Sequence, residues 1–190
     1  MSVEISKQSE SNGVLTFTLN NTDVSVANAI RRTTLTDIQC VVFKTTPHNE
    51  SKVTISKNTS RHTNEMIKQR IGCIPVHIPV SAPIDNLRID VSVKNTATHP
   101  IYVTTKDIKV FDKANETYIS DAEKEQMFPA DSITKNHIII ARLRNGIEGQ
   151  NGEELSFTGE LTISTANVDS MYVPVCQSYF VNSPDLSKID

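Results

Sequence analysis

The chain has 190 residues, of which 37% are hydrophobic and 22% charged, and its formal net charge at pH 7 is −3. This length suits one large domain or two small ones, and it buries a sizeable core without a disulfide or a metal. Because charges of both signs are scattered along the chain, nothing favours tight, independent binding to nucleic acid. With no signal-peptide core and no apolar run of about 20 residues, we expect a soluble intracellular protein without membrane contact.

A strand followed by a helix opens the chain. Residues 14–19 alternate apolar and polar side chains, and Asn12-Gly13 predicts a turn before them. Residues 21–38 read NTDVSVANAIRRTTLTDI, which predicts a helix that begins near Val24 with Asp23 as its cap. The apolar run at 40–43 predicts a second strand.

Two adjacent arginines lie near the middle of this predicted helix. Each residue of an α-helix is rotated by about 100° from the one before it, so the apolar side chains of this helix form one broad face. Arg31 lies within that face, and Arg32 lies just past its edge. A guanidinium stays charged, so Arg31 must reach water or meet a carboxylate or a carbonyl. The helix geometry alone favours a solvent-facing Arg32 and leaves both outcomes open for Arg31.

A second, shorter helix is predicted to begin at residue 63 or 64, with Glu65 in its first turn. Gly72 is expected to end this helix in a left-handed conformation, and Pro75 prevents its continuation. Arg70 repeats the pattern of the first helix, because it lies on an otherwise apolar flank.

The rest of the chain is predicted to be mainly strands. Alternating or apolar runs indicate strands at 52–56, 87–93, 101–105, 137–143, 154–164 and 171–175. The loop at 144–154, RNGIEGQNGEE, is of the kind that joins neighbouring antiparallel strands. Residues 121–128 predict at most a short helical turn, which Pro129 stops.

Residues that carry chemistry are scattered. The five histidines lie in different predicted elements, and no HExxH or CxxC spacing is present to hold zinc. The sequence contains no Gly-x-Ser-x-Gly elbow and no phosphate-binding loop. The three distant cysteines are expected to be small buried thiols in a reducing compartment. We therefore expect no catalytic site, no metal and no other cofactor.

Two stretches carry a resemblance to a known family. Residues 19–43 and 58–76 resemble the alpha-like RNA polymerase subunits: the archaeal D subunit, the third-largest subunit of eukaryotic RNA polymerase II and, more distantly, the amino-terminal domain of bacterial alpha. The first pattern is filled here by Asn21, Thr22, Asp23, Ala27, Asn28, Ile30, Arg31 and Arg32. The second is filled by Asn58, Ser60, Glu65, Arg70, Gly72, Ile74 and Pro75.

This resemblance implies a non-catalytic role in the assembly of a DNA-directed RNA polymerase. In the family, the alpha-like subunit pairs with a smaller homologue, and the pair forms the platform for the largest and second-largest subunits. The resemblance implies that Asn28, Arg31, Arg32, Glu65 and Arg70 contact partner chains. Contact with DNA or RNA would be indirect, through the complex.

The sequence departs from the family in three respects. The family usually ends with a return strand and a long carboxy-terminal helix, and that helix is missing before the last residue here, Asp190. The cysteine cluster that holds a metal or an iron–sulfur centre in some relatives is absent, so the resemblance implies no cofactor. The chain contains no tryptophan, and such divergence points to a remote lineage, for example a large DNA virus that encodes its own polymerase.

We therefore predict an α+β protein in two parts. Residues 1–44 and 179–190 are expected to form an alpha-subunit-like dimerisation segment, and residues 45–178 a β-rich inserted domain. The alternative function is a freestanding β-rich adaptor or virion structural protein. An enzyme would need clustered titratable groups, which the sequence gives little reason to expect.

Overall fold

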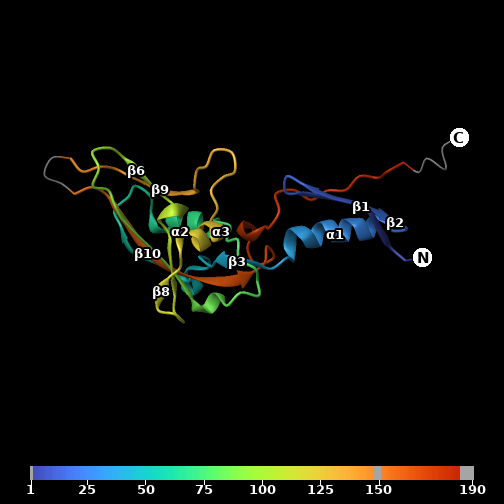
Figure 1. The fold of residues 1–190 in the computed structure, drawn as a ribbon, viewed down its shortest axis with the longest axis horizontal. Helices are drawn as coiled ribbons and strands as arrows, with labels where there is room; N and C mark the ends of the chain where they lie inside the picture. Colours follow the sequence, from blue (N-terminus) through green and yellow to red (C-terminus); the bar gives the residue numbers. More distant parts are fainter. Residues whose placement is uncertain (1, 148–150, 185–190) are drawn as a thin grey trace. The chain divides into compact units, whose positions relative to one another are not determined.

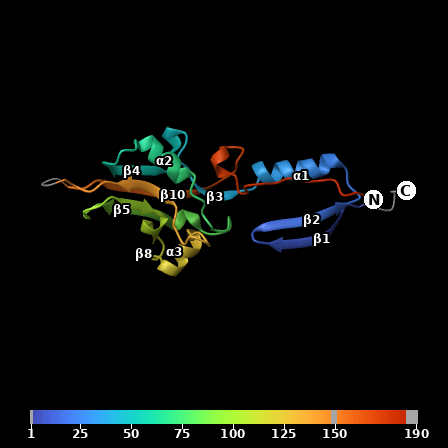
Figure 2. The same ribbon diagram turned by 90° about the horizontal axis from the view of Figure 1, so that it is seen from above.

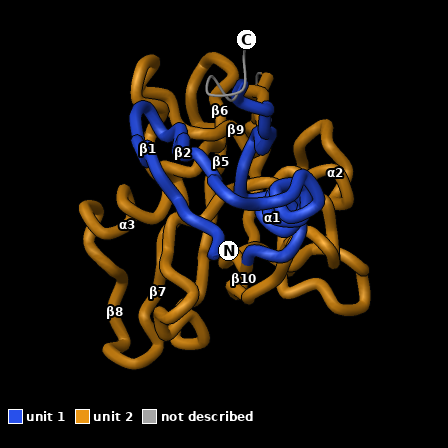
Figure 3. The backbone as a smooth tube through the Cα atoms, turned by 90° about the vertical axis from the view of Figure 1, so that its right-hand side faces the viewer, with its two compact units in different colours: residues 1–38, 173–190 blue, residues 39–172 orange. Residues whose placement is uncertain are grey.

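A computed structural model describes residues 2–147 and 151–184 of the chain (Figure 1). The described residues form a mixed α/β protein with more strand than helix, which is compatible with the predicted α+β class. The chain divides into two compact units: residues 1–38 with 173–190 form unit 1, and residues 39–172 form unit 2 (Figure 3). The expected boundaries lie a few residues further along the chain than these. An alpha-subunit-like architecture remains a prediction.

Unit 1 contains a β-hairpin and one helix. Strands β1 (Glu4–Ser11) and β2 (Val14–Asn20) pair antiparallel, and helix α1 spans Val24–Thr36. The hairpin turn uses Asn12 and Gly13 with positive φ values of 51° and 72°, the conformation that an Asn-Gly turn favours. The turn and the helix confirm the predictions. Strand β1 was missed, because its polar sequence has no alternating pattern.

Unit 2 is built around one antiparallel sheet whose strands differ in length. Its strands are β3 (Cys40–Phe43), β4 (Val53–Asn58), β5 (Leu87–Lys94), β7 (Lys109–Asp112), β8 (Thr117–Tyr118) and β10 (Glu154–Ser164). Strand β10 pairs with β3 and β4 on one side and with β5 on the other, and β7 and β8 follow β5. Figure 2 shows β10 between β4 and β5. The long strand β10 therefore organises the whole unit.

One face of this sheet is buried beneath the other elements of unit 2. These are α2 (Asn64–Gly72), α3 (Asp121–Met127) and the separate antiparallel pair of β6 (Ile101–Thr104) and β9 (Ile139–Leu143). Short 3-10 turns lie at His48–Glu50, Ile84–Asn86, Thr105–Asp107 and Ser170–Tyr172. Phe157 of β10, Ile67 of α2 and Leu143 of β9 are almost completely buried in one hydrophobic core.

The structure corrects three predictions in unit 2. Residues 171–175 do not form a strand: the backbone makes a 3-10 turn at Ser170–Tyr172, in which the Asp169 side chain accepts a hydrogen bond from the Met171 amide. The loop at 144–154 does not join paired strands, since β9 pairs with β6 and β10 with β3, β4 and β5; residues 148–150 of this loop lie outside the described residues. Residues 121–127 form a helix with a capping box at Ser120, and not only a turn.

The expected left-handed stop at Gly72 is also wrong. Gly72 is the last residue of α2, and among the described glycines only Gly13 has a positive φ. A Cβ atom at Gly72 would lie 2.6 Å from both Met171 Sδ and Thr45 Oγ1. Close packing at the end of α2, and not backbone conformation, therefore favours glycine at this position, since a Cβ atom would force the Met171 and Thr45 side chains to shift.

Among the described residues, none of the helices has the length and apolar character that crossing a membrane requires.

Candidate partner-binding site

One candidate region is helix α1 of unit 1, whose start is set by Asp23. The Asp23 carboxylate accepts a hydrogen bond of 2.7 Å from the Ser25 amide, so Asp23 is the N-cap that the sequence predicts. This bond lowers the pKa of Asp23 below its ordinary value.

We expect the helicity of α1 to depend on pH through Asp23. Because the folded-state pKa lies below the ordinary value of 3.8, the contribution of the charged cap is present above pH 3.8 and is lost as the pH falls through the folded pKa. Circular dichroism during an acid titration should show a loss of helix that is reduced in Asp23→Asn, since asparagine caps without titrating in this range. An identical loss in both proteins would contradict this role.

Among the described residues, the apolar face of α1 is partly exposed. No residue of α1 is buried, and the side chains of Val26 and Ile30 are 41% and 40% exposed. An amphipathic helix normally gains its stability by burying such a face. The apolar side chains of α1 are therefore not packed into a hydrophobic core within the described part of unit 1.

The hairpin of unit 1 also has an exposed apolar face, which sequence reasoning missed. Leu15, Phe17 and Leu19 alternate along β2 and so share one face, and Ile5 of β1 lies opposite Leu19. Ile5, Leu15 and Phe17 are among the exposed large hydrophobic residues. The period-two pattern of residues 14–19 was the signal for this face, but it did not show that the face would remain uncovered.

Arg31 meets a partner on its own helix. Its Nε and Nη2 atoms donate hydrogen bonds of 3.1 and 3.0 Å to Asn28 Oδ1, three residues earlier in α1. Both residues are half-buried, whereas Arg32 is exposed, as the helix geometry predicts. Because an amide oxygen carries no full charge, Asn28 orients the guanidinium of Arg31 without neutralising it.

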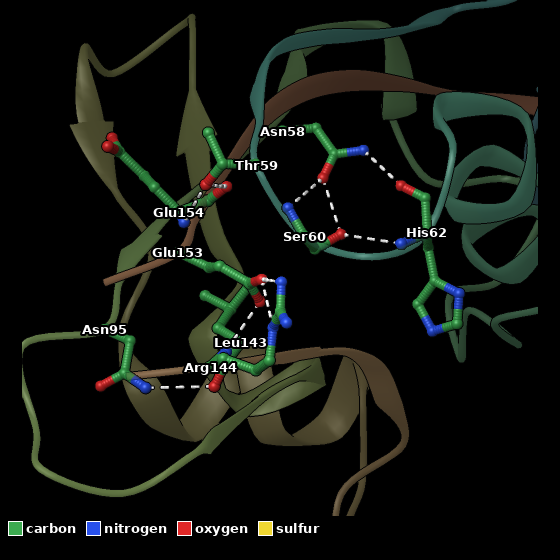
Figure 4. Close-up of polar contacts among 9 residues, drawn as sticks. All are labelled: Asn58, Thr59, Ser60, His62, Asn95, Leu143, Arg144, Glu153 and Glu154. Carbon is green, nitrogen blue, oxygen red and sulfur yellow. Dashed lines mark hydrogen bonds and ion pairs between the residues drawn. The ribbon is translucent and has the colours of Figure 1, made fainter. Parts of the chain in front are cut away.

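A separate candidate region is the loop before α2, in unit 2. Asn58 Oδ1 accepts hydrogen bonds from the amide and the hydroxyl of Ser60, and Asn58 Nδ2 donates to the His62 carbonyl (Figure 4). The Thr63 hydroxyl then accepts from the Met66 amide as the N-cap of α2. The polar side chains of this loop thus set the start of α2.

The same loop is fixed to the start of β10. The Thr59 amide donates to the Glu154 carbonyl, and the Glu154 amide donates to Thr59 Oγ1 over 2.7 Å (Figure 4). The neighbouring Glu153 carboxylate binds the Arg144 side chain, and Asn95 Nδ2 donates to the Leu143 carbonyl. These contacts are all within unit 2. The polar residues of this region therefore have a structural role, which is to hold the loop in place.

Glu65 and Arg70, the two predicted partner contacts on α2, are both exposed but differ in their hydrogen bonds. Glu65 is exposed, and hydrogen bonds from its own amide and the Thr63 hydroxyl lower its pKa. Arg70 is bound within unit 2: its Nε donates to the Ile140 carbonyl over 2.8 Å and its Nη2 to the Ile139 carbonyl over 2.7 Å. Arg70 therefore has an intramolecular role that sequence reasoning missed.

The structure brings together some of the predicted site residues and not others. Asn28 and Arg31 are bonded to each other and Arg32 lies beside them on α1, whereas Glu65 and Arg70 belong to unit 2. Within residues 2–147 and 151–184, no three His, Cys, Asp or Glu side chains are grouped so as to hold a metal ion. The expectation of buried thiols is wrong for Cys73 and Cys176, which are exposed.

Comparison with known proteins gives a weak match whose name describes no molecular function. No family model matches the chain. A protein of Tetrahymena thermophila named "Conjugation stage-specific protein" is 26% identical over 188 residues, which cover 90% of this chain and 56% of that protein. The chain thus spans about half the length of this relative. The match names no polymerase, so the assignment to the alpha-like family remains a prediction.

Proposed function

We propose that the chain is a non-catalytic assembly subunit of a multisubunit DNA-directed RNA polymerase. In this proposal unit 1 pairs with a smaller alpha-like subunit, and the pair carries the largest and second-largest subunits. The chain would act wherever that polymerase is assembled, in the nucleus or the cytoplasm, or in the virion if the source is viral. Contact with DNA or RNA would be made by the complex.

The exposed apolar face of α1 is the observation that supports the proposal most. A helix with a well-formed cap but no buried residue gains stability when another surface covers it. The exposed hairpin face of β2 belongs to the same unit and gives a partner further apolar area. These faces fit the dimerisation role that the resemblance implies for unit 1.

The pair of Asn28 and Arg31 supports the second half of the proposal. A guanidinium held on an apolar helix face by a neutral amide is oriented but remains positively charged. A carboxylate on a second chain would pair with it in bidentate geometry and so select both partner and register. Arg32, exposed beside it, adds a second cation for the same surface.

Native mass spectrometry of the complex that co-purifies with the tagged chain tests this function. We expect one chain smaller than this one together with two chains several times larger. Recovery of the chain alone, as a homodimer, or with capsid proteins would overturn the polymerase proposal. The last of these outcomes would favour the virion structural protein.

A further inference from the structure

The two-stranded pair of β6 and β9 contains an irregularity at a defined position. Thr104 pairs with Ile139 and Val103 with Ala141, so Ile140 is one extra residue on β9. Such a β-bulge leaves backbone groups that the partner strand cannot bond. Ile140 is completely buried, so its carbonyl needs another donor, whereas Ile139 is 44% exposed.

Arg70 supplies the donors. The two carbonyls that Arg70 binds belong to Ile140, the extra residue of the bulge, and to Ile139, the residue before it. Among the described residues β9 pairs with no strand other than β6, and α2 packs beside it. The guanidinium therefore supplies hydrogen-bond donors to two successive carbonyls of the bulge.

The bulge determines which side chains this strand pair displays. Val103 and Ala141 point inward and are buried, whereas Tyr102 and Arg142 form the opposite, exposed pair. The Arg142 guanidinium lies 6.0 Å from the centre of the Tyr102 ring. A shift of register by one residue would exchange the two faces, since side chains alternate along a strand.

We propose that Arg70 is a positioning residue. It holds the β9 bulge in place and so fixes the register in which β6 and β9 present Tyr102 and Arg142, and it does not itself contact a partner chain. This inference is carried by contacts within unit 2 and does not depend on the polymerase assignment. It gives Arg70 a different role from the one that the resemblance implies.

Nuclear magnetic resonance of the isolated chain tests the proposal, with Glu65→Ala as the control because Glu65 is an exposed residue on the same helix. In the unmodified protein the Arg70 Nε–H proton should exchange slowly with solvent. In Arg70→Ala we expect the amides of β9 to lose their slow exchange and the ring signals of Tyr102 to shift. Arg70→Lys should restore part of both, because one ammonium group can still donate to a carbonyl.

Two results would overturn the proposal. One is rapid exchange of the Arg70 Nε–H proton in the unmodified chain, a measurement that remains available if Arg70→Ala does not fold. The other result is that Arg70→Ala and Glu65→Ala give the same Tyr102 ring signals and the same exchange rates for the amides of β9. Because the isolated chain is used, failure here leaves the proposed polymerase function unaffected.

Discussion

Replacing Arg31 and Arg32 together by alanine is expected to abolish recovery of the second-largest polymerase subunit with the tagged chain. Truncating one partner of a buried, hydrogen-bonded charge pair across an interface costs about 2–5 kcal/mol, which lowers affinity by roughly 30-fold or more. The isolated chain should remain folded, because the hydrogen bonds that Arg31 makes with Asn28 are local to α1. Co-purification quantified by mass spectrometry measures the loss.

A matched control separates this effect from a general loss of positive charge. Arg142→Ala removes an exposed arginine of unit 2 whose guanidinium lies 6.0 Å from the centre of the Tyr102 ring, and it should leave recovery of the large subunits unchanged. Circular dichroism and thermal unfolding should be the same for the double variant and the unmodified chain. Normal recovery by the double variant would refute the role assigned to α1.

The largest expected effect on stability is that of Phe157→Ala. Phe157 is 1% exposed at the middle of β10, with Val91 of β5 opposite it on one side and Ile55 of β4 on the other. Removing a buried phenylalanine side chain costs about 3–5 kcal/mol, as lost transfer free energy and as a cavity. Since β10 forms hydrogen bonds with strands on both sides, we expect the whole of unit 2 to unfold at a lower urea concentration than in the unmodified chain.

Thr158→Ala is the matched control for this variant. Thr158 is the next residue along β10, and it is exposed on the opposite face of the sheet. Its replacement should change the free energy of unfolding by no more than about 0.5 kcal/mol. Equal destabilisation by the two substitutions would show that the face of β10 that carries Phe157 is not the core.

Local signals in the sequence predicted much of the fold. A capping side chain acts within a few residues, so Asp23 indicated where α1 begins. Alternation likewise predicted β2 and β5. It did not predict β1, a polar strand that is held by its pairing with β2. Strand pairing depends on contacts between segments that are distant in sequence. The sequence therefore did not show which strands pair.

The candidate site divides in the same way. Asn28 and Arg31 are three residues apart on one helix, so their proximity could be predicted from spacing. Arg70 bonds to a carbonyl 70 residues away, and no local pattern predicts that contact. The close packing of Gly72 against Met171 and Thr45 could not be predicted either, because both neighbours are distant in sequence. Residues whose partners are local are thus the ones that sequence reasoning placed correctly.

Hydrogen–deuterium exchange of α1 in the native complex, compared with α1 in the isolated chain, tests the central claim most directly. That claim is that another polypeptide covers the apolar face of α1 and neutralises Arg31. We predict much slower exchange for the amides of residues 24–36 in the complex, while the amides of β10 are already protected in the isolated chain. Equally fast exchange of α1 in both states would contradict the account.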